Sequence, residues 1–191
     1  TAEKTLTRGI YTLPRYSFIE ANGVSFSFNQ DITFSKLTSL QESLDSVAAG
    51  NLLYQGKYTE YPEQIATGEP FELFTIALDK ATIIDHNSID VYVNNSRTGA
   101  YQQYTEMSSL YLADPDDRVY EKRFNENGRY EITFGNNING AQLNPGDSVH
   151  IVYLKTDGKK GEVGVGAING KSVTLYTSVN FSKIRSDVKP D

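Results

Sequence analysis

Apolar and polar residues alternate along most of the chain, and a period of two is the pattern of strands that bury one face. The segments 10–13, 16–19 and 24–28 are the first to be predicted as strands. Asn22 and Gly23 stand between the second and third segments, and both tolerate the positive φ that a type I′ turn requires. The pattern therefore predicts a tight hairpin near the start of the chain.

Further strands are predicted where β-branched and aromatic residues gather between turn residues. These strands cover residues 52–54, 58–61, 71–78, 89–93, 101–105, 119–124, 129–134, 148–155 and 172–177. The loop Asn125–Gly128 predicts a second hairpin. Apolar spacing over 37–48 predicts a short amphipathic helix, and Thr105 is the expected N-cap of a helical turn that reaches Leu112.

The predicted fold class is mainly β, with two small β-rich modules of sandwich or barrel type and one or two short helices. Residues 1–85 are expected to form the first module, with the strand near 172–177 returning to it. Residues 86–157 form a second, inserted module. Residues 158–191 hold a glycine-rich connector, the last strand and a polar tail that is expected to fray from Ser182 onward.

Charge and composition narrow the class of protein. The chain has 18 basic and 24 acidic residues, a net charge of −6, whereas nucleic acids and anionic membranes require a basic face. We therefore expect neither partner. Cysteine is absent, which excludes disulfides and thiolate metal sites, and no apolar run has the length of a membrane span. Because the chain starts at Thr1 without a signal peptide, it is interpreted as a piece of a longer protein.

Residues that could carry catalysis are few. His86 and His150 lie in separate predicted elements and outside any spaced metal motif, and no nucleophile elbow or phosphate-binding loop is present. The acidic run 114–117 could bind calcium or supply a carboxylate pair, but an acidic turn followed by Arg118 is favoured. We expect no enzyme, cofactor or metal, although paired carboxylates that meet only in space leave a glycosidase open.

Tyrosine is abundant, with 13 residues, while tryptophan is absent. A carbohydrate-binding or adhesin β-module is therefore an alternative function, in which tyrosine rings stack on sugars. The candidate platforms are Tyr101, Tyr104, Tyr111, Tyr120 and Tyr130. Tyrosines in alternating strands more often pack the ring inside and leave the hydroxyl at the edge, which favours the structural interpretation.

A series of short motifs in a fixed order resembles the baseplate J-like family, which includes the large wedge protein of T-even-type contractile tails. The motifs are Ile89–Val93, Tyr104–Glu106, Asp117–Tyr120, Phe124–Gly128, Ile132–Gly135, Asn139–Gly140, Pro145–Val149, Val152–Tyr153, Gly158 and Gly161–Gly164, preceded by Thr7–Phe18. The resemblance spans roughly residues 6 to 179. The chain departs from the family pattern at Arg15, at Asn136–Asn137 and at Glu162.

The resemblance implies a structural component of a contractile-tail baseplate of a phage or prophage, located in the virion and assembled in the bacterial host cytoplasm. It implies binding to other baseplate and tail proteins and a homo-oligomer, a dimer, in the full-length protein. Exposed loops and strand edges are the expected contact sites. The candidate contact residues are Arg97, Tyr101, Asn136, Asn137, Asn139 and Gly140, and the glycine connector is a further candidate.

Overall fold

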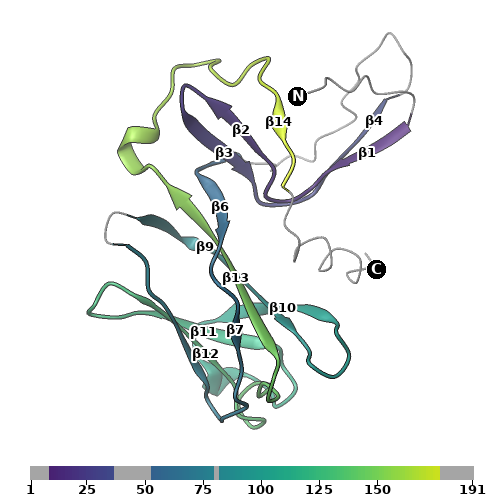
Figure 1. Ribbon diagram of the computed structural model, residues 1–191, viewed down its shortest axis with the longest axis vertical. Coiled ribbons are helices and arrows are strands. Elements are labelled where there is room, and N and C mark those ends of the chain that lie inside the picture. The colour runs from purple at the N-terminus through teal and green to yellow at the C-terminus, as the bar shows by residue number, and fades with distance from the viewer. Residues whose placement is uncertain (1–8, 37–52, 80–81, 177–191) are drawn as a thin grey trace. The chain divides into compact units, whose positions relative to one another are not determined.

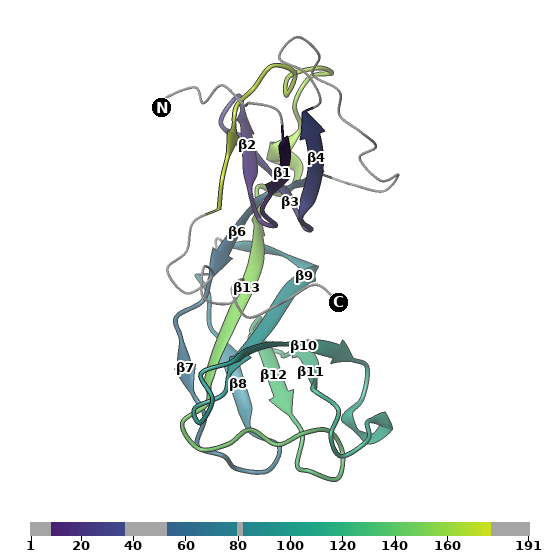
Figure 2. The same cartoon turned by 90° about the vertical axis from the view of Figure 1, so that its right-hand side faces the viewer.

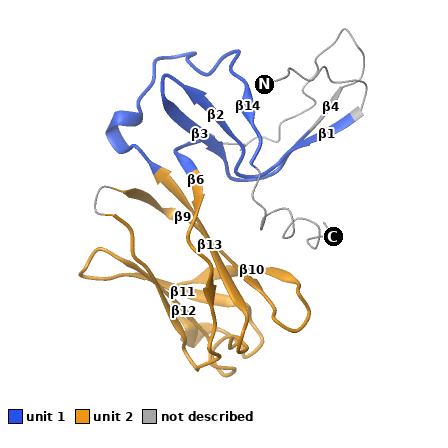
Figure 3. Cartoon of the chain, in the orientation of Figure 1, with its two compact units in different colours: residues 1–57, 156–176 blue, residues 58–155, 177–191 orange. Residues whose placement is uncertain are grey.

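The computed structural model describes residues 9–36, 53–79 and 82–176 (Figure 1). The helix predicted over 37–48 and the predicted frayed tail lie outside these residues. Contacts within the chain divide it into two compact units (Figure 3). Unit 1 holds the described residues up to Lys57 and from Thr156 to Tyr176, and unit 2 holds those from Tyr58 to Lys155.

Unit 1 contains two small antiparallel sheets. In the first, β1 (Gly9–Leu13) pairs with β4 (Ile32–Lys36). The second has the order β14 (Val173–Thr174), β2 (Phe18–Ala21), β3 (Val24–Phe28) and β5 (Leu53–Gln55). The predicted hairpin between β2 and β3 is confirmed, since Asn22 and Gly23 have φ values of 53° and 80°. The last strand, β14, pairs with β2.

The interior of unit 1 combines apolar side chains with buried hydroxyl groups. Tyr16 is fully buried at a positive φ of 68°, and its ring lies edge-on to the ring of Tyr176, with the centroids 5.6 Å apart. Ser27 is fully buried and its Oγ donates to the carbonyl of Gly56 at 2.8 Å. Ser17 Oγ accepts from the backbone N–H of Tyr176 at 3.2 Å. Hydrogen bonds thus join segments of unit 1 that are far apart in the sequence.

Unit 2 is a curled, half-barrel sheet of eight strands (Figure 2). The strands are β6 (Lys57–Glu60), β7 (Gln64–Ile65), β8 (Leu73–Ile76), β9 (Ile83–Asn94), β10 (Tyr101–Met107), β11 (Val119–Phe124), β12 (Tyr130–Phe134) and β13 (Ser148–Thr156). Their order is β6-β13-β9-β10-β11-β12-β8, and β7 pairs with β13. The predicted hairpin at Asn125–Gly128 joins β11 and β12, with Gly128 at a φ of 72°.

The boundary between the units differs from the predicted one near residue 85. The strand β8 pairs with β12 from Leu73 to Ile76, and β7 pairs with β13. Segments from 58 to 85 therefore belong to unit 2. The reason is physical: the period-two pattern shows which residues form strands, but not which strands they pair with.

One core fills the curl of unit 2. Its fully buried members come from several strands, and they are Val91, Ile132, Phe134 and Val149. The Phe134 ring contacts those of Phe74 and Tyr104 edge-on, with centroid distances of 5.7 and 5.5 Å. Burying each such side chain contributes about 1.5–3 kcal/mol, so this cluster is the main source of stability in unit 2.

The mainly-β class is confirmed, and the only helices among the described residues are two 3-10 turns, η1 (Leu110–Leu112) and η2 (Gly158–Gly161). The helical turn predicted from Thr105 was wrong at its start, since Thr105 pairs with Val119 as part of β10. The β10–β11 pairing is parallel, and cross-strand pairing outweighs a local capping preference. Of the predicted helical turn, only Leu110–Leu112 is helical, as η1, which lies in the connection between these two strands.

Candidate functional site

Several loops gather at the end of unit 2 where β9 ends and β10 begins. The first is the turn 136–140, which follows β12. The Asn136 side-chain oxygen accepts from the N–H groups of Ile138 and Asn139, at 3.1 and 2.8 Å. Asn137 has a φ of 64°, and its N–H donates to the carbonyl of Gly140 at 2.9 Å. The turn is therefore held by its own asparagines, which favour this local bonding.

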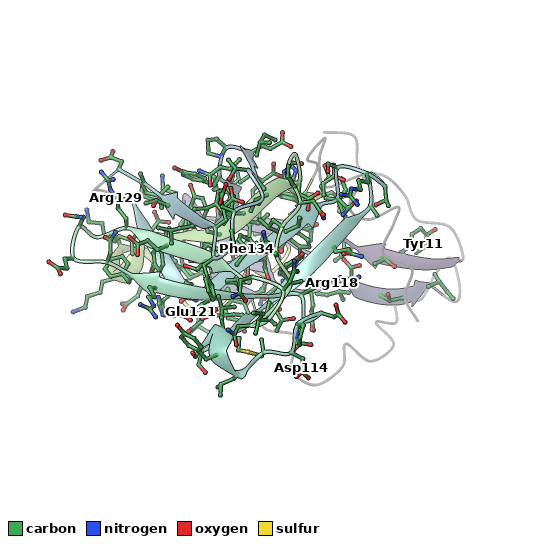
Figure 4. The ribbon with its side chains drawn as sticks, turned by 90° about the horizontal axis from the view of Figure 1, so that it is seen from below. Tyr11, Asp114, Arg118, Glu121, Arg129 and Phe134 are labelled. Atoms are coloured by element: carbon green, nitrogen blue, oxygen red, sulfur yellow. The ribbon has the colours of Figure 1, made fainter. Side chains whose placement is uncertain are left out.

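The acidic run 114–117 forms the second loop, and Figure 4 labels Asp114 and Arg118 in it and directly after it. The Asp117 carboxylate accepts from the N–H of Asp114 at 2.9 Å. The carbonyl groups of Asp114 and Asp117 accept from the N–H groups of Gly140 and Ala141, at 3.2 and 2.8 Å. The two loops are thus bonded to each other through their backbones.

The third loop, 95–100, joins β9 to β10 and is tied to the turn 144–147. Ser96 donates its N–H to Asp147 Oδ1 at 2.8 Å, and Asn144 donates its N–H to Asp147 Oδ2 at 2.9 Å. Burial alone would raise the pKa of Asp147, but these hydrogen bonds outweigh it and hold the pKa below its usual value. Asp147 therefore stays ionised and serves as the clamp between the two loops.

A hollow of about 340 Å³ lies among these loops. Amide side chains line much of it, and they are Asn95, Gln102, Gln142 and Asn144. The charged side chains in its lining are Asp116, Arg118 and Asp147. Tyr104 also lines it while only 8% exposed. Burial and the Asp147 charge raise the pKa of Tyr104 against the opposing effect of Arg118, so its hydroxyl keeps its proton.

Beside the hollow, the turn η1 presents apolar side chains to solvent. Its first residue, Leu110, is buried, and the carboxylate of Glu121 accepts from the Leu110 N–H at 3.1 Å. The next two residues, Tyr111 and Leu112, are 77% and 74% exposed. Ile138, at the tip of the turn 136–140, is 68% exposed. Since Gly140 lies against Leu110 and Val119, these three exposed side chains belong to one end of unit 2.

The predicted contact residues occupy different environments. Arg97 and Asn137 are exposed, and Asn136 and Asn139 are half-buried. Tyr101 and Gly140 are buried, and the Tyr101 ring lies 5.2 Å from the ring of His150. Both predicted loops border the hollow, but none of the six predicted residues lines it. The glycine connector that follows β13 lies in unit 1.

The hollow itself was missed, and a signal for it was available. Asp116 was considered as part of an acidic run that could bind calcium or pair two carboxylates, and Arg118 as part of a family motif, but neither was predicted to line a ligand site, although both lie just before the strand predicted from residue 119. Binding and catalytic residues are often found on loops that a rigid scaffold holds in place, and such loops begin at the ends of strands. The tyrosines considered as sugar platforms are mostly unsuited to stacking, because four of them are at most 9% exposed; these are Tyr101, Tyr104, Tyr120 and Tyr130.

The remaining candidates for chemistry stay apart. His150 is buried, and its Nε2 lies 3.2 Å from Glu63, while His86 is exposed. Among the described residues, no three histidine or acidic side chains come close enough together to hold a metal ion. In the same part of the chain, no helix has the length and apolarity to cross a membrane.

No family model matches this chain, and neither the curated proteins nor the solved structures contain a match to it.

Proposed function

We propose that this chain is a structural, non-enzymatic component of the contractile-tail baseplate of a phage or prophage, and that it acts through protein–protein contacts. Its partners in this proposal are other baseplate and tail proteins and a second copy of itself. Its location is the virion, after assembly in the bacterial cytoplasm. The ordered motifs that resemble the baseplate J-like family support the family assignment.

The positions of those motifs in the fold add support. The motifs Asp117–Tyr120 and Asn139–Gly140 are separate in the sequence, yet the N–H of Ala141, which directly follows the second motif, donates to the Asp117 carbonyl at 2.8 Å. Gly135 lies so close to the backbone of Gly140 that a Cβ at Gly135 would overlap it. Three of the motifs that carry the resemblance, Asp117–Tyr120, Ile132–Gly135 and Asn139–Gly140, thus lie in contact, as motifs with a shared structural role would.

The observation that carries the contact proposal is the exposure of Tyr111, Leu112 and Ile138 on loops that are hydrogen-bonded to β11 or to the neighbouring loop 114–117. Large exposed apolar side chains on a rigid support are typical of the centres of protein–protein interfaces. A rigid loop also loses little conformational entropy on binding. This apolar end of unit 2 is therefore the expected contact surface.

Co-expression with each tail protein of the same genome tests the proposal. We expect a stable complex with at least one of them, and a loss of affinity of about tenfold or more in the variant Tyr111→Ser/Leu112→Ser/Ile138→Ser. Ile83→Ser is the matched control, because Ile83 is 52% exposed but lies at the opposite end of β9. This control should bind like the parent chain.

Two results would contradict different parts of the proposal. If no tail protein forms a complex, the baseplate function is wrong. If a complex forms and the triple variant retains it, the function stands but the contact surface lies elsewhere. Far-UV circular dichroism of each variant separates either result from a loss of folding.

A further inference from the structure

The hollow in unit 2 contains polar groups that are not satisfied by the protein itself. Among the described residues, no hydrogen bond or ion pair engages the guanidinium of Arg118 or the carboxylate of Asp116. The same holds, within that part of the chain, for the side-chain amide of Gln102 and the hydroxyl of Tyr104. These four groups all line one hollow.

Tyr104 makes the hollow more than a surface irregularity. Its side chain is over nine-tenths buried, its ring packs against Phe134, and it still lines the hollow. Its hydroxyl has no hydrogen bond among the described residues and keeps some exposed surface, so water or a ligand in the hollow can bond to it. The hollow therefore has a fixed polar group in its wall, supplied by the core of the sheet.

The charges of the lining restrict the ligand. Arg118 opposes a metal ion, and the carboxylates of Asp116 and Asp147 oppose an anion such as phosphate. An apolar ligand is disfavoured, because it would leave Arg118, Asp116, Gln102 and the Tyr104 hydroxyl without hydrogen-bond partners. A neutral ligand that both donates and accepts many hydrogen bonds fits this lining. The volume, about 340 Å³, lies at the small end of the range for ligand sites.

We propose that this hollow binds a neutral saccharide of one or two units. Adjacent sugar hydroxyls can donate to the Asp116 carboxylate and accept from the Arg118 guanidinium, while Gln102 and the Tyr104 hydroxyl bond to the remaining oxygens. This site differs from the tyrosine-stacking surface considered from the sequence. Here the sugar is recognised by hydrogen bonds to polar side chains, and no aromatic ring stacks on it. The inference does not depend on the assembly function and adds a second activity to unit 2.

The geometry favours binding over hydrolysis. A glycosidase needs a carboxylic acid with a raised pKa to protonate the leaving group. Both oxygens of Asp147 instead accept hydrogen bonds that hold its pKa below its usual value. Asp147 is therefore held as an ionised carboxylate and not as the acid that glycoside hydrolysis requires.

NMR titration of the ¹⁵N-labelled chain provides the test. The probes are glucose, galactose, N-acetylglucosamine and maltose at up to about 10 mM, since a ligand with few contacts binds in the millimolar range. We expect at least one of them to shift the side-chain amide of Gln102 and the backbone amides of 116–118. Arg118→Gln and Asp116→Asn should each weaken binding about tenfold.

Arg97→Gln is the matched control, because Arg97 is an exposed arginine of the adjacent loop that does not line the hollow. It should bind as the parent chain does. Absence of binding by all four sugars overturns the proposal, as does binding that Arg118→Gln and Asp116→Asn leave unchanged. Glycine and inorganic phosphate are further probes. Shifts of the same amides by either of them, without shifts by the sugars, would assign the hollow to a charged ligand instead.

Discussion

Unit 1 and unit 2 are both built from β-strands, but they bury very different amounts of apolar surface. Among the described residues, six buried apolar side chains belong to unit 1, namely Tyr16, Phe18, Ile19, Ala21, Val24 and Ile32. All other buried apolar side chains of that part of the chain lie in unit 2. Unit 1 adds buried serine hydroxyls that bond to backbone groups, whereas unit 2 depends on one continuous core.

The difference follows from strand length. Within the described residues, strands of unit 1 have at most five residues, so alternation places only two or three side chains of each on the inner face. In unit 2, β9 has 12 residues and β13 has nine, and these two strands lie side by side in the sheet, so their inner faces supply one continuous apolar surface. A large core can hold long loops in fixed positions, which is why the candidate surface and the hollow are both found on unit 2.

The largest expected effect comes from truncating the core of unit 2. Phe134→Ala removes a fully buried ring that contacts Phe74 and Tyr104, and we expect it to lower the free energy of unfolding by about 3–5 kcal/mol. Urea denaturation measures the loss. Hydrogen-exchange mass spectrometry should show the lost protection within 58–155.

The counterpart in unit 1 is Phe18→Ala in β2, which should reduce exchange protection within 9–36. Together the two variants test whether the units are separate in stability. If each variant lowered exchange protection equally in both units, the two units would unfold as one. The difference between their cores would then be a difference in packing and not in stability.

Both hairpins could be predicted because their signals are local. Asn22 and Gly23 adopt the positive φ values that their chemistry favours, and Gly128 does so in the second hairpin. A further strand, β4, was overlooked although Ile32-Thr33-Phe34-Ser35 alternates in the sequence. Local patterns in the sequence are therefore sufficient to predict individual strands and hairpins, and β4 could have been predicted from the same alternation.

The arrangement of elements required information that a local pattern does not contain. The pairing of β10 with β11 is parallel, and it places Thr105 in a strand where a helix cap was expected. That pairing also brings Tyr104 and Arg118 to the same hollow, together with Asp147 from a third segment. Such a set can be recognised only once the sheet order is known, whereas its bordering loops could be predicted from their turn residues.

The second-largest effect is expected from a variant that tests how the turn 136–140 is held against unit 2. Gly135→Ala places a Cβ against the backbone carbonyl of Gly140, so the turn 136–140 must shift. We expect a loss of about 2–3 kcal/mol in unfolding free energy, measured by urea denaturation, because backbone cannot give way as a flexible side chain does.

Gly99→Ala is the control for Gly135→Ala. Gly99 has a φ of 68° with open space around it, so the variant should cost only about 1 kcal/mol. An equal loss in both variants would show that the close approach of Gly135 to Gly140 contributes nothing, and that the loops are held by their hydrogen bonds alone.

A smaller effect tests the role of buried hydroxyls in unit 1. Ser27→Ala removes the donor to the Gly56 carbonyl and should lower the unfolding free energy by about 1–2 kcal/mol in urea denaturation. Ser25→Ala on the same strand is the control, because Ser25 is half-buried and its hydroxyl has no hydrogen bond within the described residues. If the two variants were equally stable, unit 1 would depend on its apolar side chains alone.

The smallest effect concerns the pH dependence of unit 2. Burial lowers the pKa of His150 despite the opposing charges of Glu63 and Glu60, with Glu63 Oε1 3.2 Å from Nε2. The unfolded chain therefore binds a proton more readily than the folded one, so unfolding free energy should fall as pH drops below about 6.5. His150→Gln should flatten this slope in urea denaturation between pH 5 and 8. His86→Gln, which removes the other histidine from the surface, should keep the slope of the parent chain. A slope that persisted in His150→Gln would mean that carboxylates elsewhere cause the pH dependence, and that the buried histidine in β13 is tolerated in both of its charge states.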